Sequence, residues 1–159
     1  MLLPLCSREE SEKFLRDSLL ESPSDPWRSI VRAITDYASG DIIGLCGMVV
    51  LRGPEEAEVW YLVKPESWGN GVATGAVRQL LDFGFGELGL HRVWATCLPE
   101  NPASARVLEK LGMRKEGFII NNLKIHGVWK SSCLYAMLAE EWNGPTLEPP
   151  EHGNIKPAG

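Results

Sequence analysis

The central part of the chain, residues 66–118, is ESWGNGVATGAVRQLLDFGFGELGLHRVWATCLPENPASARVLEKLGMRKEGF. A glycine-containing loop leads directly into residues 74–89, whose apolar side chains recur at helical spacing. A β-type run follows at residues 90–98, and a short helix is predicted over residues 101–111, with Gly112 as its terminating glycine. This order of loop, helix, strand and helix indicates a domain in which helices and strands share one core.

The flanking sequence adds mainly strands. β-type runs are predicted at Trp27–Thr35, Ile42–Leu51, Glu56–Val63, Arg114–Lys124 and Val128–Leu138. A capping box, S-x-x-E, predicts a further helix over Ser7–Leu20. Helices alternate with strands in the middle of the chain and paired strands flank them, so the predicted fold class is α+β (mixed α/β) with a single sheet.

Length and composition exclude several classes of protein. The 159 residues suit one domain, predicted over residues 1–142, followed by a Pro- and Gly-rich disordered tail over residues 143–159. A net charge of −5 argues against nucleic acid as a partner, and the longest apolar run, Ile42–Leu51, is too short to span a membrane. The four cysteines form no CxxC pair, so we expect no metal site and a reducing, cytoplasmic setting.

The first stretch with chemical meaning is the loop Trp68–Ala73, WGNGVA, which precedes a predicted helix. The first N–H groups of a helix lack partners, and the glycines at 69 and 71 let a bulky anion approach them. The chemistry implied is binding of a phosphate or pyrophosphate, although a plain loop before a helix explains the same residues. The loop matches neither a Walker A motif nor a complete dinucleotide motif, because Thr74 stands where a third glycine would be.

The second stretch opens the short helix with Asn101, Pro102 and Ser104. Asn101 is a suitable N-cap, with Pro102 as the first helical residue. Ser104 lies one turn before Leu108 on the same face of the helix. Polar side chains at a helix start beside a strand end can bind the amide groups of a ligand. Capping alone accounts for Asn101 fully and for Ser104 in part.

With both motifs present in this order, the sequence resembles the GNAT superfamily of N-acetyltransferases over residues 66–118, and more loosely over residues 7–142. It looks most like the RimJ/RimL branch, the ribosomal-protein-alanine acetyltransferases. The resemblance implies a single GNAT-like domain with a central, mostly antiparallel twisted sheet flanked by helices. The strand and helix that open the family fold are not evident in Met1–Cys6, so we expect them to be missing.

The resemblance implies acetyl-CoA as cosubstrate and an amine as acceptor. The third strand would splay from its neighbour near its end and pair with the pantetheine arm, and the loop after it would hold the pyrophosphate. The residues that the resemblance assigns to acetyl-CoA are Leu62, Val63, Trp68, Gly69, Asn70, Gly71, Val72, Ala73, Thr74, Asn101 and Ser104.

Catalytic groups follow from the chemistry of aminolysis, which needs a base for the amine proton. Glu116 matches a glutamate that serves as the base in the RimL-like branch, and Glu58 is a second candidate; a surface carboxylate is the plain alternative for each. We therefore expect Glu116→Gln to lower turnover and to flatten the alkaline rise of the rate. Many relatives protonate the thiolate with a tyrosine where this chain has Leu108, so Ser104, Cys97 or water would take that role.

Direct attack on the thioester is expected, since an acyl-cysteine route would need a reactive Cys97. The resemblance favours a protein N-terminal amine as acceptor. A small amine (a polyamine, an amino acid or an antibiotic) and a non-catalytic CoA-binding module are the alternatives. Trp60 or Tyr61 could line the acceptor cleft. A homodimer through the C-terminal strand hairpin is a further possibility that the resemblance implies, because such folds often dimerise there.

Overall fold

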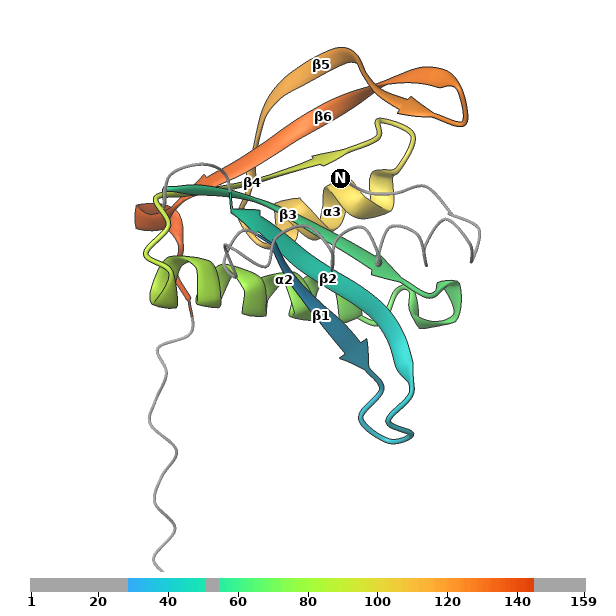
Figure 1. Cartoon of the computed structure of the whole chain (residues 1–159), viewed down its shortest axis with the longest axis vertical. Helices are drawn as coiled ribbons and strands as arrows, with labels where there is room; N and C mark the ends of the chain where they lie inside the picture. Colours follow the sequence, from blue (N-terminus) through green and yellow to red (C-terminus); the bar gives the residue numbers. More distant parts are fainter. Residues whose placement is uncertain (1–28, 51–54, 145–159) are drawn as a thin grey trace, which may run out of the picture.

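The computed structural model describes residues 29–50 and 55–144, which contain one six-stranded sheet with the strand order β1-β2-β3-β4-β6-β5 (Figure 1). The strands are β1 Ser29–Thr35, β2 Ile42–Val50, β3 Glu56–Val63, β4 Arg92–Cys97, β5 Arg114–Ile125 and β6 Val128–Leu138. All neighbours are antiparallel except β3 and β4, which run parallel. The prediction of an α+β domain with a mostly antiparallel sheet is therefore confirmed.

Turn chemistry explains two of the strand connections. Asp36 closes the β1–β2 turn, because its carboxylate accepts hydrogen bonds from the backbone N–H groups of Ala38 (3.0 Å) and Ser39 (2.9 Å). The β5–β6 hairpin turns at His126 and Gly127, both of which have positive φ, 47° and 81°. Such a pair is typical of a tight two-residue hairpin.

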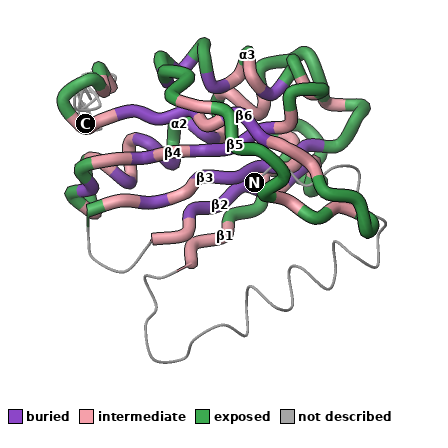
Figure 2. Tube along the Cα trace, turned by 90° about the horizontal axis from the view of Figure 1, so that it is seen from above, coloured by how far each residue is buried: buried purple, intermediate pink, exposed green. Residues whose placement is uncertain are grey.

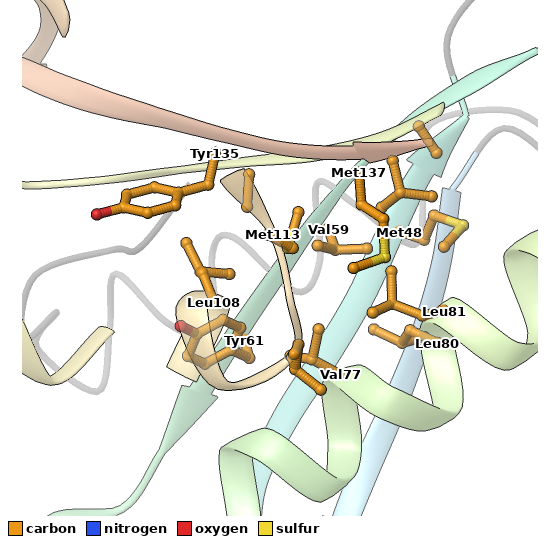
Figure 3. Packing of buried hydrophobic residues seen from close by; sticks show 14 of the residues in the cluster. Met48, Val59, Tyr61, Val77, Leu80, Leu81, Leu108, Met113, Tyr135 and Met137 are labelled. Carbon is orange, nitrogen blue, oxygen red and sulfur yellow. The ribbon is translucent and has the colours of Figure 1, made fainter. Parts of the chain in front are cut away.

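Two helices lie on one face of the sheet. α2, Val72–Asp82, follows β3, and α3, Pro102–Lys110, follows β4. Val77, Leu80 and Leu81 of α2 and Leu108 of α3 point into the same apolar layer as residues of the sheet (Figure 3). Buried residues accordingly run through the central strands and the second half of β6, whereas β5 and the start of β6 are largely exposed (Figure 2).

The end of the helix after β3 differs from the sequence prediction. Residues 74–89 are predicted as one helix, but α2 ends at Asp82 and a π-helical turn, Phe83–Glu87, follows it. Two glycines weaken the α-helix here. Gly84 also lies against β2: a Cβ at this position would be 2.9 Å from Met48 Cε, so any larger residue would force the Met48 side chain to shift.

Two sequence predictions lie outside the described residues. They are the helix over Ser7–Leu20 and most of the tail, of which only Asn143 and Gly144 are described. Within residues 29–50 and 55–144, no helix is long and apolar enough to cross a membrane.

Candidate active site

β3 and β4 separate partway along their length. Their last residue pair is Glu58–Trp94, whereas β3 continues to Val63 and β4 to Cys97. Over the separated part, β3 stays paired with β2, and β4 with β6. Each strand therefore turns backbone N–H and C=O groups toward the separation, which we call the β3–β4 split, and an extended ligand can pair with such groups as an added strand does.

The loop that follows β3 carries most of the residues expected to hold acetyl-CoA. Gly69 and Gly71 have φ values of 78° and 75°, a left-handed conformation that favours glycine. Gly71 is the N-cap of α2, and no side chain caps the helix. The first N–H groups of α2, from Val72 onward, are therefore available to an anion.

Trp68 ties this loop to the end of β3. Its indole Nε1–H donates a hydrogen bond to the Val63 carbonyl oxygen at 2.7 Å, while more than half of the side chain stays exposed. Val63 and Leu62 both lie on the separated part of β3. The structure thus brings the end of β3, the loop and the start of α2 together as one continuous surface.

The start of α3 is built as the sequence predicts. The Asn101 side-chain oxygen accepts a hydrogen bond from the Ser104 backbone N–H at 3.1 Å, and Pro102 is the first helical residue. α3 follows β4 after a short connection, so its first turn is anchored to the other strand of the split. Asn101 and Ser104 consequently lie beside the split from the β4 side.

Ser104 has a partner that sequence reasoning does not identify. The Tyr61 hydroxyl lies 2.7 Å from Ser104 Oγ, where either oxygen can be the donor, and 3.3 Å from the Ser104 carbonyl oxygen, which can only accept. Both residues are buried, and burial raises the pKa of Tyr61 to about 12 against the smaller opposing effect of the Ser104 hydrogen bond. Strand alternation suggests that either Trp60 or Tyr61 lines the cleft, but it contains no signal for the contact with Ser104.

Cys97 is poorly suited to form an acyl-enzyme. It is buried at the end of β4 opposite Cys133 of β6. Burial, followed by the neighbouring Cys133, raises the pKa of the Cys97 thiol to about 11. The reactive thiolate is therefore disfavoured at neutral pH. Leu108, where a tyrosine would serve as acid, is fully buried in the core.

Glu116 lies in an ion-pair network. Its carboxylate accepts hydrogen bonds from Arg92 Nη1 (3.3 Å) and Nη2 (2.6 Å) and from Arg114 Nη2 (2.9 Å), and Arg114 also pairs with Glu141. The hydrogen bonds from Arg92 are the largest cause of the lowered pKa of Glu116. Arg92 is the first residue of β4, whereas the split opens toward its last residue. These contacts lower the basicity of Glu116 and hold its carboxylate beside Arg92, at the end of β4 that is still paired with β3.

Glu58, the second candidate, belongs to the last residue pair before the split. Ala57, Val59 and Tyr61 belong to the core beneath the helices, so the intervening Glu58 points to the opposite face of the sheet, as Trp60 does. The two candidate carboxylates thus differ in position: Glu58 is at the apex of the split and Glu116 is held at the start of β4. Among the described residues, no group of His, Cys, Asp and Glu side chains could hold a metal ion.

Comparisons with known proteins agree with this architecture. Residues 4–114 match the family described as "Acetyltransferase (GNAT) domain". The uncharacterized N-acetyltransferase YnaD of Bacillus subtilis is 41% identical over 91 residues, which is 57% of this chain and 54% of YnaD. The putative ribosomal N-acetyltransferase YdaF of B. subtilis is 30% identical over 134 residues, which is 80% of this chain and 73% of YdaF. A spermidine N(1)-acetyltransferase of Vibrio cholerae is 28% identical over 97 residues, 60% of this chain and 56% of that protein.

Two solved structures with 28% and 36% sequence identity show the same fold. A GNAT-family acetyltransferase from Bacillus anthracis has a TM-score of 0.71 at 28% identity, covering 86% of this chain and 77% of that one. Mycobacterium smegmatis RimJ in complex with CoA-disulfide has a TM-score of 0.61 at 36% identity, covering 64% and 50%. The chain spans about half the length of the B. subtilis proteins YnaD and YjcK, at 54% and 50%. The match to the family model covers more than half of this chain, which therefore belongs to the GNAT acetyltransferase family.

Proposed function

We propose that the protein is an acetyl-CoA-dependent N-acetyltransferase that transfers the acetyl group to a primary amine by direct attack. The observation that carries this proposal is the β3–β4 split, whose two strands lead into the uncapped start of α2 and into the first turn of α3. Backbone pairing in the split, an anion site beside it and a polar helix start are what a long pyrophosphate-bearing thioester requires.

Open space around the loop before α2 supports assigning the pyrophosphate to it. A Cβ added at Gly69 or Gly71 would meet no atom within 4 Å, so the loop leaves room above the helix start. We assign the pyrophosphate to the backbone N–H groups of the loop and of Val72, Ala73 and Thr74. Leu62 and Val63 would pair with the pantetheine arm, and Trp68 would hold the loop in position through its bond to Val63.

Acetyl-CoA supplies an activated acyl group and a thiolate leaving group. As the amine nitrogen bonds to the acyl carbon and the carbon–sulfur bond breaks, a positive charge on nitrogen and a negative charge on sulfur must both be relieved. We assign the sulfur side to Ser104, whose hydroxyl lies at the start of α3 and would donate a hydrogen bond to the departing thiolate, which then takes its proton from water.

We assign the amine proton to Glu58. The core and both helices occupy one face of the sheet, so the amine would approach the split from the other face, to which Glu58 points. Glu116 would instead have a structural role in its pairs with Arg92 and Arg114.

The acceptor that we propose is the N-terminal amine of a protein. The support is the likeness to YdaF, named as a putative ribosomal N-acetyltransferase, and to RimJ at 36% identity. The spermidine N(1)-acetyltransferase relatives, at 28% and 29% identity, favour a polyamine as the second candidate.

One experiment tests the donor and the acceptor together. Calorimetric titration with acetyl-CoA comes first, followed by a thiol-release assay with a peptide bearing a free N-terminus, spermidine, a free amino acid and an aminoglycoside. We expect saturable binding and release of CoA with the peptide, and no release with the same peptide acetylated at its N-terminus. A higher kcat/KM for spermidine would move the acceptor to the polyamine class. Binding without release across the panel would leave a CoA-binding module, and no binding would contradict the proposal.

A further inference from the structure

Tyr61 and Ser104 connect the two sides of the split. Tyr61 lies on the separated part of β3, and Ser104 lies in the first turn of the helix that follows β4. Their hydroxyl oxygens are 2.7 Å apart, and the two residues are 43 positions apart in the chain. The contact thus joins β3 to α3 on the helix side of the sheet, where Tyr61 lies in the apolar layer with Val77 and Leu108 (Figure 3).

The hydrogen bonds of this contact allow two arrangements, one in which Ser104 donates to Tyr61 and one in which Tyr61 donates to Ser104 Oγ. A tyrosine hydroxyl has one hydrogen, and two oxygens of Ser104 lie within its reach, the carbonyl at 3.3 Å and Oγ at 2.7 Å. Burial keeps the phenol protonated, since the pKa of Tyr61 is raised to about 12. When Tyr61 is the donor, the Ser104 hydroxyl accepts on one side and keeps its own hydrogen for another acceptor. Within the described part of the chain, Tyr61 is the side chain that bonds to Ser104 Oγ.

We infer that Tyr61 is a positioning residue for Ser104: its donated hydrogen bond orients the Ser104 hydroxyl so that the Ser104 hydrogen points into the β3–β4 split. This rests on the proposed role of Ser104 toward the leaving thiolate. Without Tyr61, the hydroxyl would rotate among its staggered positions and bond equally well to backbone carbonyls of its own helix. The reaction would then lose a preorganised donor, while the binding surface for acetyl-CoA would remain.

The test is a double-mutant cycle on kcat with Tyr61→Phe, Ser104→Ala and the double variant. We expect S104A to lower kcat about 100-fold, as loss of one preorganised hydrogen-bond donor to a developing negative charge does. Y61F should lower kcat about tenfold, the scale of one lost hydrogen bond, with the KM for acetyl-CoA unchanged within about twofold. In the S104A background, Y61F should have no further effect on kcat, because the group that it orients is already absent.

Tyr135→Phe is the matched control. Tyr135 is also a buried tyrosine of the sheet, and its hydroxyl donates a hydrogen bond to α3, to Glu109 Oε1 at 3.2 Å. Y135F therefore removes a comparable bond between sheet and helix without touching Ser104. We expect Y135F and Y61F to lower the unfolding free energy similarly, and only Y61F to lower kcat.

Other effects of Y61F and S104A on kcat would separate the role of Ser104 from that of Tyr61. If Y61F leaves kcat unchanged while S104A lowers it, Ser104 keeps its role and the inference about Tyr61 is overturned. If Y61F lowers kcat by the same factor in the wild type and in S104A, the inference is also overturned, because Tyr61 would then act independently of Ser104. No loss in S104A would contradict the proposed role of Ser104 itself. Should Y61F fail to fold, Tyr61→Met, which keeps apolar volume without the hydroxyl, replaces it with the same expectations.

Discussion

Glu58 and Glu116 are both strand carboxylates, and their surroundings give them different expected roles. Glu116 has two arginines on its carboxylate and a lowered pKa, with the Arg92 hydrogen bonds as the largest cause. Glu58 lies at the last β3–β4 pair, where the split begins. Residue type alone does not separate them; the neighbours across the sheet do.

This difference predicts opposite results for two substitutions. Glu58→Gln should lower kcat about 100-fold near neutral pH, the scale of general base catalysis, and the deficit should shrink at high pH, where the amine is neutral without help. Glu116→Gln should leave the alkaline rise of the rate in place, contrary to the sequence-based expectation for this residue. Both predictions can be checked by measuring the rates of the two variants from about pH 6 to about pH 10, the range over which the acceptor amine loses its proton. A flattened rise in E116Q alone would return the base role to Glu116.

Glu116 should affect stability instead, and in a pH-dependent way. Because its pKa in the folded protein lies below the ordinary value of 4.5, its ion pairs stabilise the fold above that pH and lose their effect as the carboxylate is protonated in acid. We expect E116Q to lower the unfolding free energy by about 0.5–1 kcal/mol at pH 7. Urea unfolding of both proteins at pH 7 and in acid should show the difference closing as the pH falls below 4.5. A difference that stays constant over this range would exclude the ion pairs as its source.

Cys97 is expected to be dispensable for chemistry. Its pKa of about 11, caused mainly by burial, leaves almost no thiolate at neutral pH. Cys97→Ala should keep kcat within about threefold and should cost roughly 1 kcal/mol of stability, because a small buried side chain is truncated. Mass spectrometry of the wild type incubated with acetyl-CoA and no amine should find no acetylated Cys97. An acetylated thiol that transfers its group to added amine would establish the acyl-cysteine route.

At the level of single elements, several bounds follow from local sequence. β3 and β6 have the predicted bounds, Glu56–Val63 and Val128–Leu138, because β-branched and aromatic residues between Pro or Gly boundaries mark a strand. α3 begins and ends close to its predicted limits, since Asn101 caps it and Gly112, with φ 85°, follows it. The helix predicted over residues 74–89 extends beyond the end of α2 at Asp82. Gly84 and Gly86, which follow Asp82, have low helix propensity, and Gly84 packs against Met48.

The start of α2 offers a test with two glycines of one segment. Gly71 has a φ of 75°, so Gly71→Ala should cost about 1–2 kcal/mol and weaken acetyl-CoA binding by disturbing the helix start. Gly75 lies inside α2 with open space around a Cβ, so Gly75→Ala should stabilise the protein by about 0.5–1 kcal/mol. Thermal unfolding and calorimetric titration of both variants provide the comparison. Equal effects of the two alanines on binding would show that the Gly71 conformation is not needed at the donor site.

At the scale of the whole molecule, the parallel β3–β4 pair separates one half of the sheet from the other. β1, β2 and β3 form one antiparallel set, and β4, β6 and β5 form a second (Figure 1). The helix after each central strand returns to the same face, so both helix starts border the split. A site assembled in this way depends on both halves, and the residues proposed to bind and to react come from each.

The sequence by itself determined the order of strands and helices in the described part of the chain, the glycine-containing loop before α2, the capped start of α3 and, through these motifs, the resemblance to the family. Each of these features depends on residues a few positions apart. Only the tertiary structure decided that Tyr61 meets Ser104 across 43 residues, that Arg92 binds Glu116 across 24, and that Cys97 is buried against Cys133. The physical reason is that these contacts exist only once the strands have become neighbours in the sheet, and strand neighbours are set by the packing of the whole core.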